Sequence, residues 1–259
     1  MPDTPLVRPD WQLPTGVHAF VTTRHGGFSK APYASFNLGH HVGDDANAVA
    51  RNRELLNSEL AQQCNDAALQ LQWIQQVHGI DVQRIDDVIA TPPVADASYT
   101  TQSGIALGVL TADCLPVLYC SHDGNEIAVA HAGWRGLCNG VLEATLAQFK
   151  CAPSRVRCWL GPAIGPCHFE VGEEVRDAFL QQASPNDREA TLSAFKPGLN
   201  AGKWMGDLYV LARLRLQAAG VADVAGQVQC TVCLADKYYS YRHQNPTGRF
   251  ATVIARASS

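Results

Sequence analysis

Three apolar runs near the middle of the chain constrain its fold most strongly. They cover residues 104–112, 115–120 and 126–132, and only short breaks separate them. Apolar runs of this length are typical of strands whose two faces are both buried. The sequence therefore predicts three adjacent buried strands. Cys114 lies in the break between the first two, and His131 lies at the end of the third.

The rest of the chain predicts strands that cluster rather than alternate strictly with helices. Further strands are expected at residues 17–23, 71–77, 155–161 and 249–255, and helices at residues 45–60, 136–149, 171–182 and 207–220. Asp44, Asp45 or Asn47 can cap the first helix, and Gly220 can end the last one after a start at Asp207. This pattern favours the α+β class. We find no internal repeat and no polar linker, so we expect a single domain over residues 1–259.

Composition and charge exclude several classes of protein. Of 259 residues, 46% are hydrophobic and 17% are charged, an ordinary balance for a globular protein. A net charge of −4 gives no general reason to expect binding to nucleic acid or to an anionic membrane. The N-terminus lacks the pattern of a secretory signal, and no apolar run reaches the roughly 20 residues of a spanning helix. Nine cysteines, an odd number, fit a reducing compartment. We expect a soluble, cytoplasmic monomer.

Three residues with metal-binding side chains lie at strand ends. His78 follows the strand expected at residues 71–77, and Cys114 and His131 flank the central runs. Two imidazoles and a thiolate suit Zn²⁺, and a catalytic zinc typically has three protein ligands and one open position. The separations of 36 and 17 residues match no local ligand pattern. Two buried histidines with a small buried cysteine, or a Cys–His nucleophile pair, therefore stay open as alternatives.

Eight blocks of the sequence resemble, in order, the signature blocks of one family. The blocks are TTRHGGFS, SFNLGHHVGDD, QVHG, ADAS, TADCLPVL, HAGWRG, GPAIGPCHFEVG and YYSYR…TGRFATVI. They resemble the YfiH family, also described as a polyphenol oxidase or purine nucleoside phosphorylase YfiH-type family, and they extend over nearly the whole chain. The resemblance implies a zinc site made by His78, Cys114 and His131. It also implies a layered α/β/β/α fold related to that of the cytotoxic-necrotizing-factor toxins, whose active sites use Cys and His.

The resemblance further implies an enzyme that cleaves adenosine, inosine, guanosine or methylthioadenosine with phosphate and that also deaminates adenosine. Deamination suits zinc, which lowers the pKa of bound water to about 7 and so prepares it to attack C6 of a purine. A carboxylate must transfer the protons, and Asp113 and Glu170 are the candidates. Cys114 is interpreted as a ligand that would regain nucleophilic character in the metal-free protein.

Phosphorolysis requires cations that hold phosphate near C1′ of the ribose. Arg24, Arg135 and Arg242 lie in the motif blocks, and a guanidinium can bind phosphate oxygens through two hydrogen bonds. The position of Arg135 at an expected helix start favours a structural pairing for that residue. Asn37 and Asp96 are candidates for orienting the ribose, although both residue types are also common in turns.

Other functions compete with a nucleoside phosphorylase. A laccase needs a multicopper array rich in histidine, whereas the chain has nine histidines and only His40 and His41 are adjacent. One site with two nitrogens and one sulfur can still bind Cu²⁺ in vitro. A second enzyme class is an amidase that hydrolyses a misbuilt cell-wall precursor, UDP-N-acetylmuramoyl-L-serine. The third alternative is a non-catalytic scaffold stabilised by a metal. Three ligands without an evident fourth argue against it, because they indicate an open site, whereas structural zinc is usually four-coordinate.

A C-x-x-C pair at Cys230 and Cys233 gives a weak signal. No second pair accompanies it, and on a strand the two side chains would face opposite sides. We expect these cysteines to fill space rather than to bind a second metal.

Overall fold

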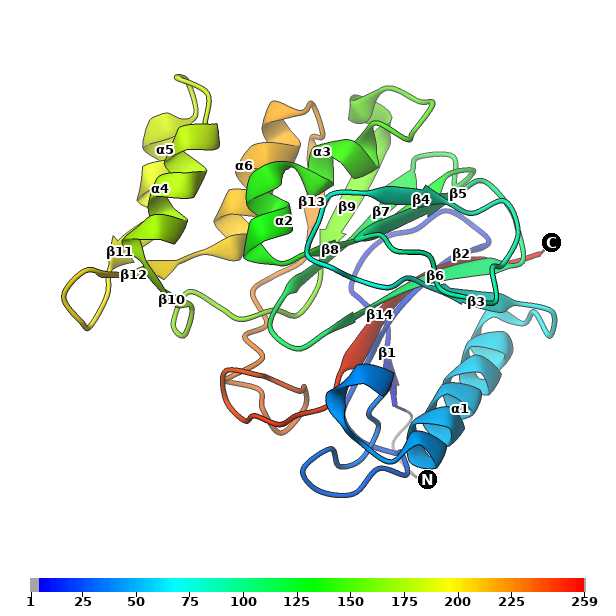
Figure 1. The fold of residues 1–259 in the computed structure, drawn as a ribbon. Helices are drawn as coiled ribbons and strands as arrows, with labels where there is room; N and C mark the ends of the chain where they lie inside the picture. The colour runs from blue at the N-terminus through cyan, green and yellow to red at the C-terminus, as the bar shows by residue number, and fades with distance from the viewer. Residues whose placement is uncertain (1–4, 259) are drawn as a thin grey trace.

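Two large sheets lie face to face at the centre of the molecule (Figure 1). The computed structural model describes residues 5–258. The five-stranded sheet has the order β1 (Leu6–Val7), β2 (Val17–Thr22), β14 (Phe250–Arg256), β6 (Ile105–Thr111) and β3 (Gln70–Trp73). The six-stranded sheet has the order β13 (Asp223–Ala225), β9 (Val156–Leu160), β7 (Leu115–Ser121), β8 (Ile127–Ala132), β5 (Ala97–Thr100) and β4 (Val82–Arg84).

Helices cover the outer face of each sheet. Helix α1 (Ala46–Cys64) packs on the five-stranded sheet, and α2 (Trp134–Asn139), α3 (Val141–Leu146) and α6 (Leu208–Ala218) pack on the six-stranded sheet (Figure 1). The chain also contains two short 3₁₀ helices, His40–Val42 before α1 and Pro153–Arg155 before β9. The layers are therefore helix, sheet, sheet and helix, as the resemblance to the YfiH family implied.

The alternation of side chains along β7 explains why its whole run is apolar. Val117 and Tyr119 face the helices, whereas Leu118 and Cys120 face the opposite sheet. Successive strand residues point to opposite faces, so a strand between two layers needs apolar residues at every position. The prediction of strands buried on both faces is thus confirmed for β7.

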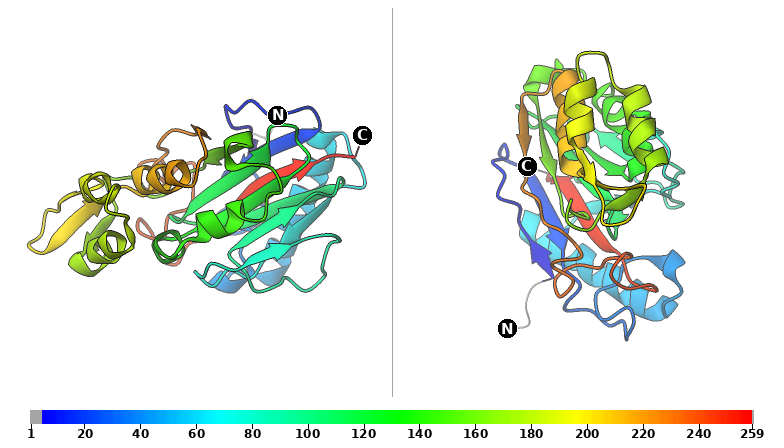
Figure 2. Two further views of the ribbon diagram at one scale, coloured as in Figure 1. Left: turned by 90° about the horizontal axis from the view of Figure 1, so that it is seen from above. Right: turned by 90° about the vertical axis from the view of Figure 1, so that its left-hand side faces the viewer.

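A third sheet extends the molecule to one side. It contains β10 (Glu170–Gly172), β12 (Lys203–Gly206) and β11 (Phe195–Pro197), and it lies beside α4 (Glu173–Gln182) and α5 (Arg188–Ser193). Figure 2 shows this part projecting away from the two large sheets. Phe169, Phe179 and Phe195 join the same apolar cluster as α2, α3 and α6, so the extension shares a core with the main layers.

The structure corrects three predicted elements. The three central runs do not all lie side by side, because β6 belongs to the five-stranded sheet and β7 and β8 to the six-stranded one. The helix predicted at residues 136–149 is two short helices that meet at Gly140, whose φ of 106° ends the first. The strand predicted at residues 71–77 ends at Trp73, and a single bridge at Gln75 follows. None of the described helices has the length and apolar character needed to cross a membrane.

Candidate metal centre

The three predicted ligands come together where the chain passes between the two large sheets. His78 lies between β3 and β4, and Cys114 lies between β6 and β7, so each stands on a crossing from one sheet to the other. His131 is the penultimate residue of β8, opposite Pro116 of β7. The Nε2 atom of His78 lies 3.8 Å from the Sγ atom of Cys114, and the two imidazole rings meet edge to face at 4.8 Å. One donor atom from each residue lies within 4.8 Å of the others.

Sharp backbone turns aim these side chains. His78 has a φ of 61° and Asp113, next to Cys114, has a φ of 94°, values that residues other than glycine rarely adopt. Gly133 follows β8, and a Cβ atom there would lie 2.8 Å from the His78 ring and 3.1 Å from the Cys114 sulfur. The backbone at Gly133 therefore approaches two of the ligands as closely as a residue without a side chain allows.

The Asp96 carboxylate bonds to two of the three ligand residues. It is fully buried, and its Oδ1 atom lies 2.8 Å from His131 Nδ1. The backbone N–H groups of Val77, His78 and Gly79 donate hydrogen bonds to the same carboxylate. A carboxylate on the second nitrogen of a ligating histidine fixes the orientation of its ring. The oxygens of Asp96 are thus bonded to the protein, and its assignment to ribose binding stays a prediction.

The pKa values of Cys114 and His131 shift in opposite directions. Burial raises the pKa of Cys114, but the charges and hydrogen bonds of His131 and His78 outweigh it and lower that pKa to about 6. Burial lowers the pKa of His131, but the Cys114 thiolate and Asp96 raise it to about 9. Both shifts favour a thiolate on Cys114 beside an imidazolium on His131 near neutral pH when no metal is bound. A thiolate is the form of cysteine that binds a metal or attacks an electrophile.

This donor set fits zinc. Two imidazoles and one thiolate are common zinc ligands, and Asp96 supplies the outer contact that such histidines usually have. His131 is buried, Cys114 is half-buried and His78 is exposed, so one side of the site faces solvent. The geometry thus leaves a position for a substrate or a water molecule.

Asp113 and Arg242 form a second layer next to Cys114. The Asp113 carboxylate accepts a hydrogen bond of 2.6 Å from the Thr231 hydroxyl and one of 2.7 Å from the backbone N–H of Arg242. The Arg242 guanidinium donates to the carbonyl oxygens of His168 and Glu170. Asp113 therefore lies beside the ligands in a fixed orientation, and Arg242 is exposed close to it.

Glu170, the other predicted proton carrier, faces a different part of the protein. Its carboxylate accepts hydrogen bonds from the backbone of Leu199 and the side chain of Asn200, in the turn between β11 and β12. Among residues 5–258 these are its hydrogen-bond partners, so the carboxylate does not contact the three ligands in this structure.

Two of the predicted substrate-binding residues have structural partners instead. The Arg24 guanidinium donates to the carbonyl oxygens of Ala34 and Ala235 and lies over the Tyr239 ring. Asn37 is fully buried, and its amide bonds within its own loop and to the N–H of Arg249. Both residues hold loops together, and their assignment to substrate binding stays a prediction. Arg135 is exposed and lies over the ring of its neighbour Trp134.

Arg249 is a functional candidate that the sequence analysis missed. It immediately precedes β14, and Phe250 is paired with Thr111 at the end of β6, two residues before Asp113. Burial lowers the pKa of Arg249, and the negative charges of Cys114 and Asp113 partly offset that effect. The TGRFATVI block contained this arginine, but only the register of β14 against β6 shows that it lies near the end of β6, the strand that leads to Cys114.

Comparison with known proteins decides the family. The model of the family described as multi-copper polyphenol oxidoreductase laccase matches residues 18–257. The chain is 43% identical to the purine nucleoside phosphorylase YfiH of Escherichia coli, over 96% of this chain and 98% of that one. The chain belongs to the YfiH family.

Further YfiH-family relatives cover nearly the whole chain. A purine nucleoside phosphorylase of Pseudomonas aeruginosa is 48% identical over 95% of this chain and 96% of its own. The crystal structure of a Neisseria meningitidis protein superposes with a TM-score of 0.89 at 42% identity, covering 98% of this chain and all of that one. YlmD of Geobacillus stearothermophilus superposes with a TM-score of 0.86 at 31% identity, over 100% and 98% of the two chains. The mixed α+β fold is therefore the fold of this family.

Proposed function

We propose that this protein is a zinc-dependent purine nucleoside phosphorylase that cleaves adenosine, inosine, guanosine and methylthioadenosine and also deaminates adenosine. The observation that carries the proposal is the open site formed by His78, Cys114 and His131 over Asp96. Relatives named purine nucleoside phosphorylase are 43% and 48% identical to it over nearly their full length, which supports the same activity here. We further propose that it acts as a monomer on nucleoside and phosphate alone.

The three ligands would hold the zinc ion, and Asp96 would keep the His131 ring in place. When bound, zinc supplies a Lewis acid that lowers the pKa of water, which favours hydrolytic deamination at C6 of adenosine. A copper ion would find an acceptable donor set in the same residues. The second cluster of metal-binding side chains within residues 5–258 has one histidine and three cysteines, which gives no support to a histidine-rich multicopper array.

Phosphorolysis requires that a phosphate oxygen bonds to C1′ while the bond from C1′ to the purine breaks. The electron pair of the broken bond goes to the purine, which takes up a proton. The backbone N–H of Arg242 donates to Asp113, and Arg249 precedes the strand residue that pairs with Thr111, so we assign phosphate binding to these two arginines. We assign the proton transfer to Asp113, because it is the sequence neighbour of Cys114 and bonds to Thr231 and Arg242, whereas the Glu170 carboxylate bonds to Asn200.

An exposed aromatic ring supports recognition of a purine. Tyr241 is 53% exposed and directly precedes Arg242, whose backbone N–H donates to Asp113. An aromatic ring stacks on any base, so it would bind adenosine and guanosine alike. Val77 and Ile80, which are close to His78 in the sequence, are 51% and 40% exposed and offer apolar surface near that ligand.

The test is product analysis with purified protein of known zinc content. Adenosine is incubated with and without phosphate, and adenine, ribose 1-phosphate and inosine are separated by chromatography. Phosphate-dependent adenine that disappears in Cys114→Ala, but persists in the control Cys151→Ala, supports the phosphorylase. Inosine formed without phosphate supports the deaminase. Full activity of Cys114→Ala would disprove this active site.

A cysteine hydrolase is the second candidate, because Cys114, His131 and Asp96 also form a nucleophile–base–carboxylate arrangement. The fold relation to cytotoxic-necrotizing-factor toxins stays a prediction that would fit this chemistry. The thiolate would attack the amide carbon of a substrate such as UDP-N-acetylmuramoyl-L-serine, and the amine would leave with a proton from His131. A water molecule would then cleave the resulting thioester, giving its proton to His131 and releasing the acid and the Cys114 thiolate. Amide hydrolysis that survives zinc removal but not Cys114→Ala would favour this candidate over the phosphorylase.

A further inference from the structure

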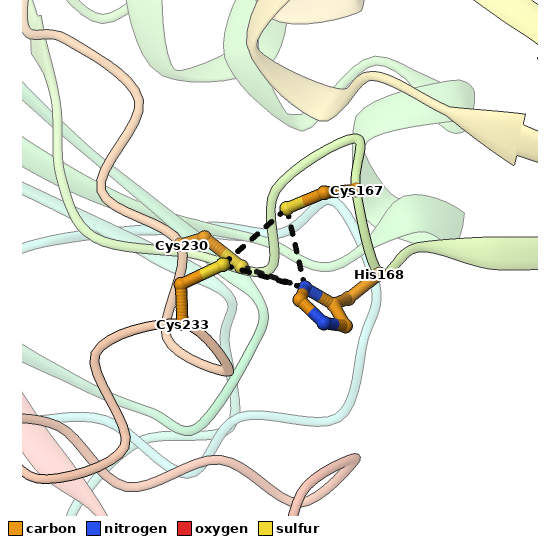
Figure 3. Close-up of side chains that lie close together, drawn as sticks. All are labelled: Cys167, His168, Cys230 and Cys233. Carbon is orange, nitrogen blue, oxygen red and sulfur yellow. Dashed lines mark hydrogen bonds between the residues drawn. The ribbon is translucent and has the colours of Figure 1, made fainter.

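A second group of metal-binding side chains lies outside the site described above. Cys167, His168, Cys230 and Cys233 converge on one point, and we call them the four-residue cluster (Figure 3). The Nδ1 atom of His168 lies 3.2 Å from the sulfur of Cys167 and 3.5 Å from the sulfurs of Cys230 and Cys233. The sulfurs of Cys167 and Cys233 are 3.5 Å apart. Figure 3 shows all four side chains pointing toward one another.

The cluster joins two loops that are distant in sequence. Cys167 and His168 lie in the loop between β9 and β10, and Cys230 and Cys233 lie in the long segment between β13 and β14. The segment that contains the C-x-x-C pair is a turn, in which the N–H of Leu234 donates to the carbonyl oxygen of Cys230. The expectation that the two cysteines face opposite sides is therefore wrong, since it assumed a strand.

The spacing of the four atoms matches a tetrahedral zinc site. With zinc–sulfur bonds of about 2.3 Å and zinc–nitrogen bonds of about 2.0 Å, tetrahedral angles place sulfurs about 3.8 Å apart and sulfur and nitrogen about 3.5 Å apart. The observed distances of 3.2 to 3.5 Å are close to these values. Hydrogen bonding alone explains the convergence poorly, because thiols are weak donors and weak acceptors.

We propose that the four-residue cluster binds a zinc ion as a closed, structural site. Three cysteines and one histidine are a standard set for four-coordinate structural zinc, whereas the site at Cys114 has three ligands and an open side. Cys167 and Cys233 are exposed, so the ion can enter from solvent. Gly165 leaves room for the cluster, since a Cβ atom there would lie 2.9 Å from the Cβ atom of Cys230.

The zinc would also fix one wall of the candidate active site. Thr231, which follows Cys230, donates its hydroxyl hydrogen to Asp113, and Arg242 donates to the carbonyl oxygen of His168. Both loops of the cluster are thus bonded to the residues beside Cys114. Joining the loops through a metal would hold Asp113 and Arg242 in place without contact between the zinc and the substrate.

The experiment counts zinc ions per chain in purified protein and in single variants. The wild type is expected to hold about two, and Cys233→Ser and Cys114→Ala about one each, while the double variant holds almost none. Cys151→Ser, which changes a cysteine outside both sites, should keep the wild-type content. After cobalt exchange, Cys114→Ala should retain the thiolate-to-metal absorption of a site with three cysteines. Wild-type zinc that Cys233→Ser leaves unchanged would overturn the proposal.

A measurement on the unaltered chain keeps the proposal testable if a variant fails to fold. Native protein is alkylated at its thiols with and without chelator, and the modified peptides are identified by mass spectrometry. Cys167 and Cys233 are exposed and should react quickly unless a metal covers them. A bound metal is supported if Cys167, Cys230 and Cys233 are protected from alkylation and all three become reactive once chelator is added. Rapid alkylation of Cys167 and Cys233 in the presence of zinc contradicts the proposed zinc site. A disulfide between Cys167 and Cys233 in freshly purified protein would also contradict it, because it removes two ligands.

Discussion

At the scale of single residues, Asp96 is the side chain on which the geometry of the metal centre most depends. Asp96→Asn replaces one acceptor oxygen with an amide group that faces N–H donors, although the size of the side chain hardly changes. We expect zinc affinity to fall roughly 10- to 100-fold, measured by competition with a chelator. Asp86→Asn, at an exposed carboxylate, is the control. An unchanged affinity would mean that the Asp96 contact with His131 does not orient that ligand.

Gly133 tests the close approach of the backbone to two ligands. Gly133→Ala places a methyl group against the His78 ring and the Cys114 sulfur, so one of them must shift. We expect zinc content to drop and the free energy of unfolding to fall by about 1–3 kcal/mol. Zinc analysis and urea denaturation are the measurements. Normal zinc content would show that the ligands tolerate the extra carbon.

The residues of the site differ in how far the sequence could predict them. His78, Cys114 and His131 carry metal-binding groups inside recognisable motifs. Their separations of 36 and 17 residues match no local ligand pattern. Asp96 and Arg249 were missed or assigned another role, because their functions depend on partners distant in sequence. Only the pairing of β14 with β6 places Arg249 near the end of β6, the strand that leads to Cys114. The turn at Cys230 was missed because a strand was assumed.

At the scale of elements, the N-cap of α6 offers a prediction with a matched control. The Asp207 side chain accepts hydrogen bonds from the N–H groups of Tyr209 and Val210. Asp207→Ala leaves these donors without the cap, so the free energy of unfolding should fall by about 1 kcal/mol. Asp187 has the same position in α5 but makes no capping bond, so Asp187→Ala should cost less. Equal losses in urea denaturation would refute a capping role.

The elements themselves were predictable where local chemistry determines them. Helices α1 and α6 begin at their Asp caps, as expected, because a carboxylate satisfies backbone N–H groups that the helix leaves unpaired. The membership of strands in sheets was not predictable. Two residues with positive φ, His78 and Asp113, mark crossings between the sheets, and an apolar run reads the same in either sheet. The predicted adjacency of β6 and β7 therefore failed at Asp113.

At the scale of the whole molecule, metal removal tests how the layers and the projecting extension are held together. His78 and Cys114 lie on crossings between the large sheets, His131 lies at the end of β8, and the four-residue cluster joins the loops after β9 and β13. Both groups of ligands depend on the folded arrangement, so zinc should bind the native state in preference to the unfolded chain. A hundredfold excess over the dissociation constant then adds about 2.7 kcal/mol per site. For a chain of this size the two sites would raise Tm by roughly 10–20 °C.

Calorimetry with zinc and with excess chelator measures this shift, and two variants divide it between the sites. Cys114→Ala should keep the share that comes from the four-residue cluster, and Cys233→Ser the share from the three ligands. Because the cluster is closed by four residues and the other site is open on one side, we expect Cys233→Ser to lose the larger share. A Tm that chelator leaves unchanged in the wild type would show that neither group stabilises the fold through a metal. A shift lost entirely in Cys114→Ala would assign all of it to the candidate active site.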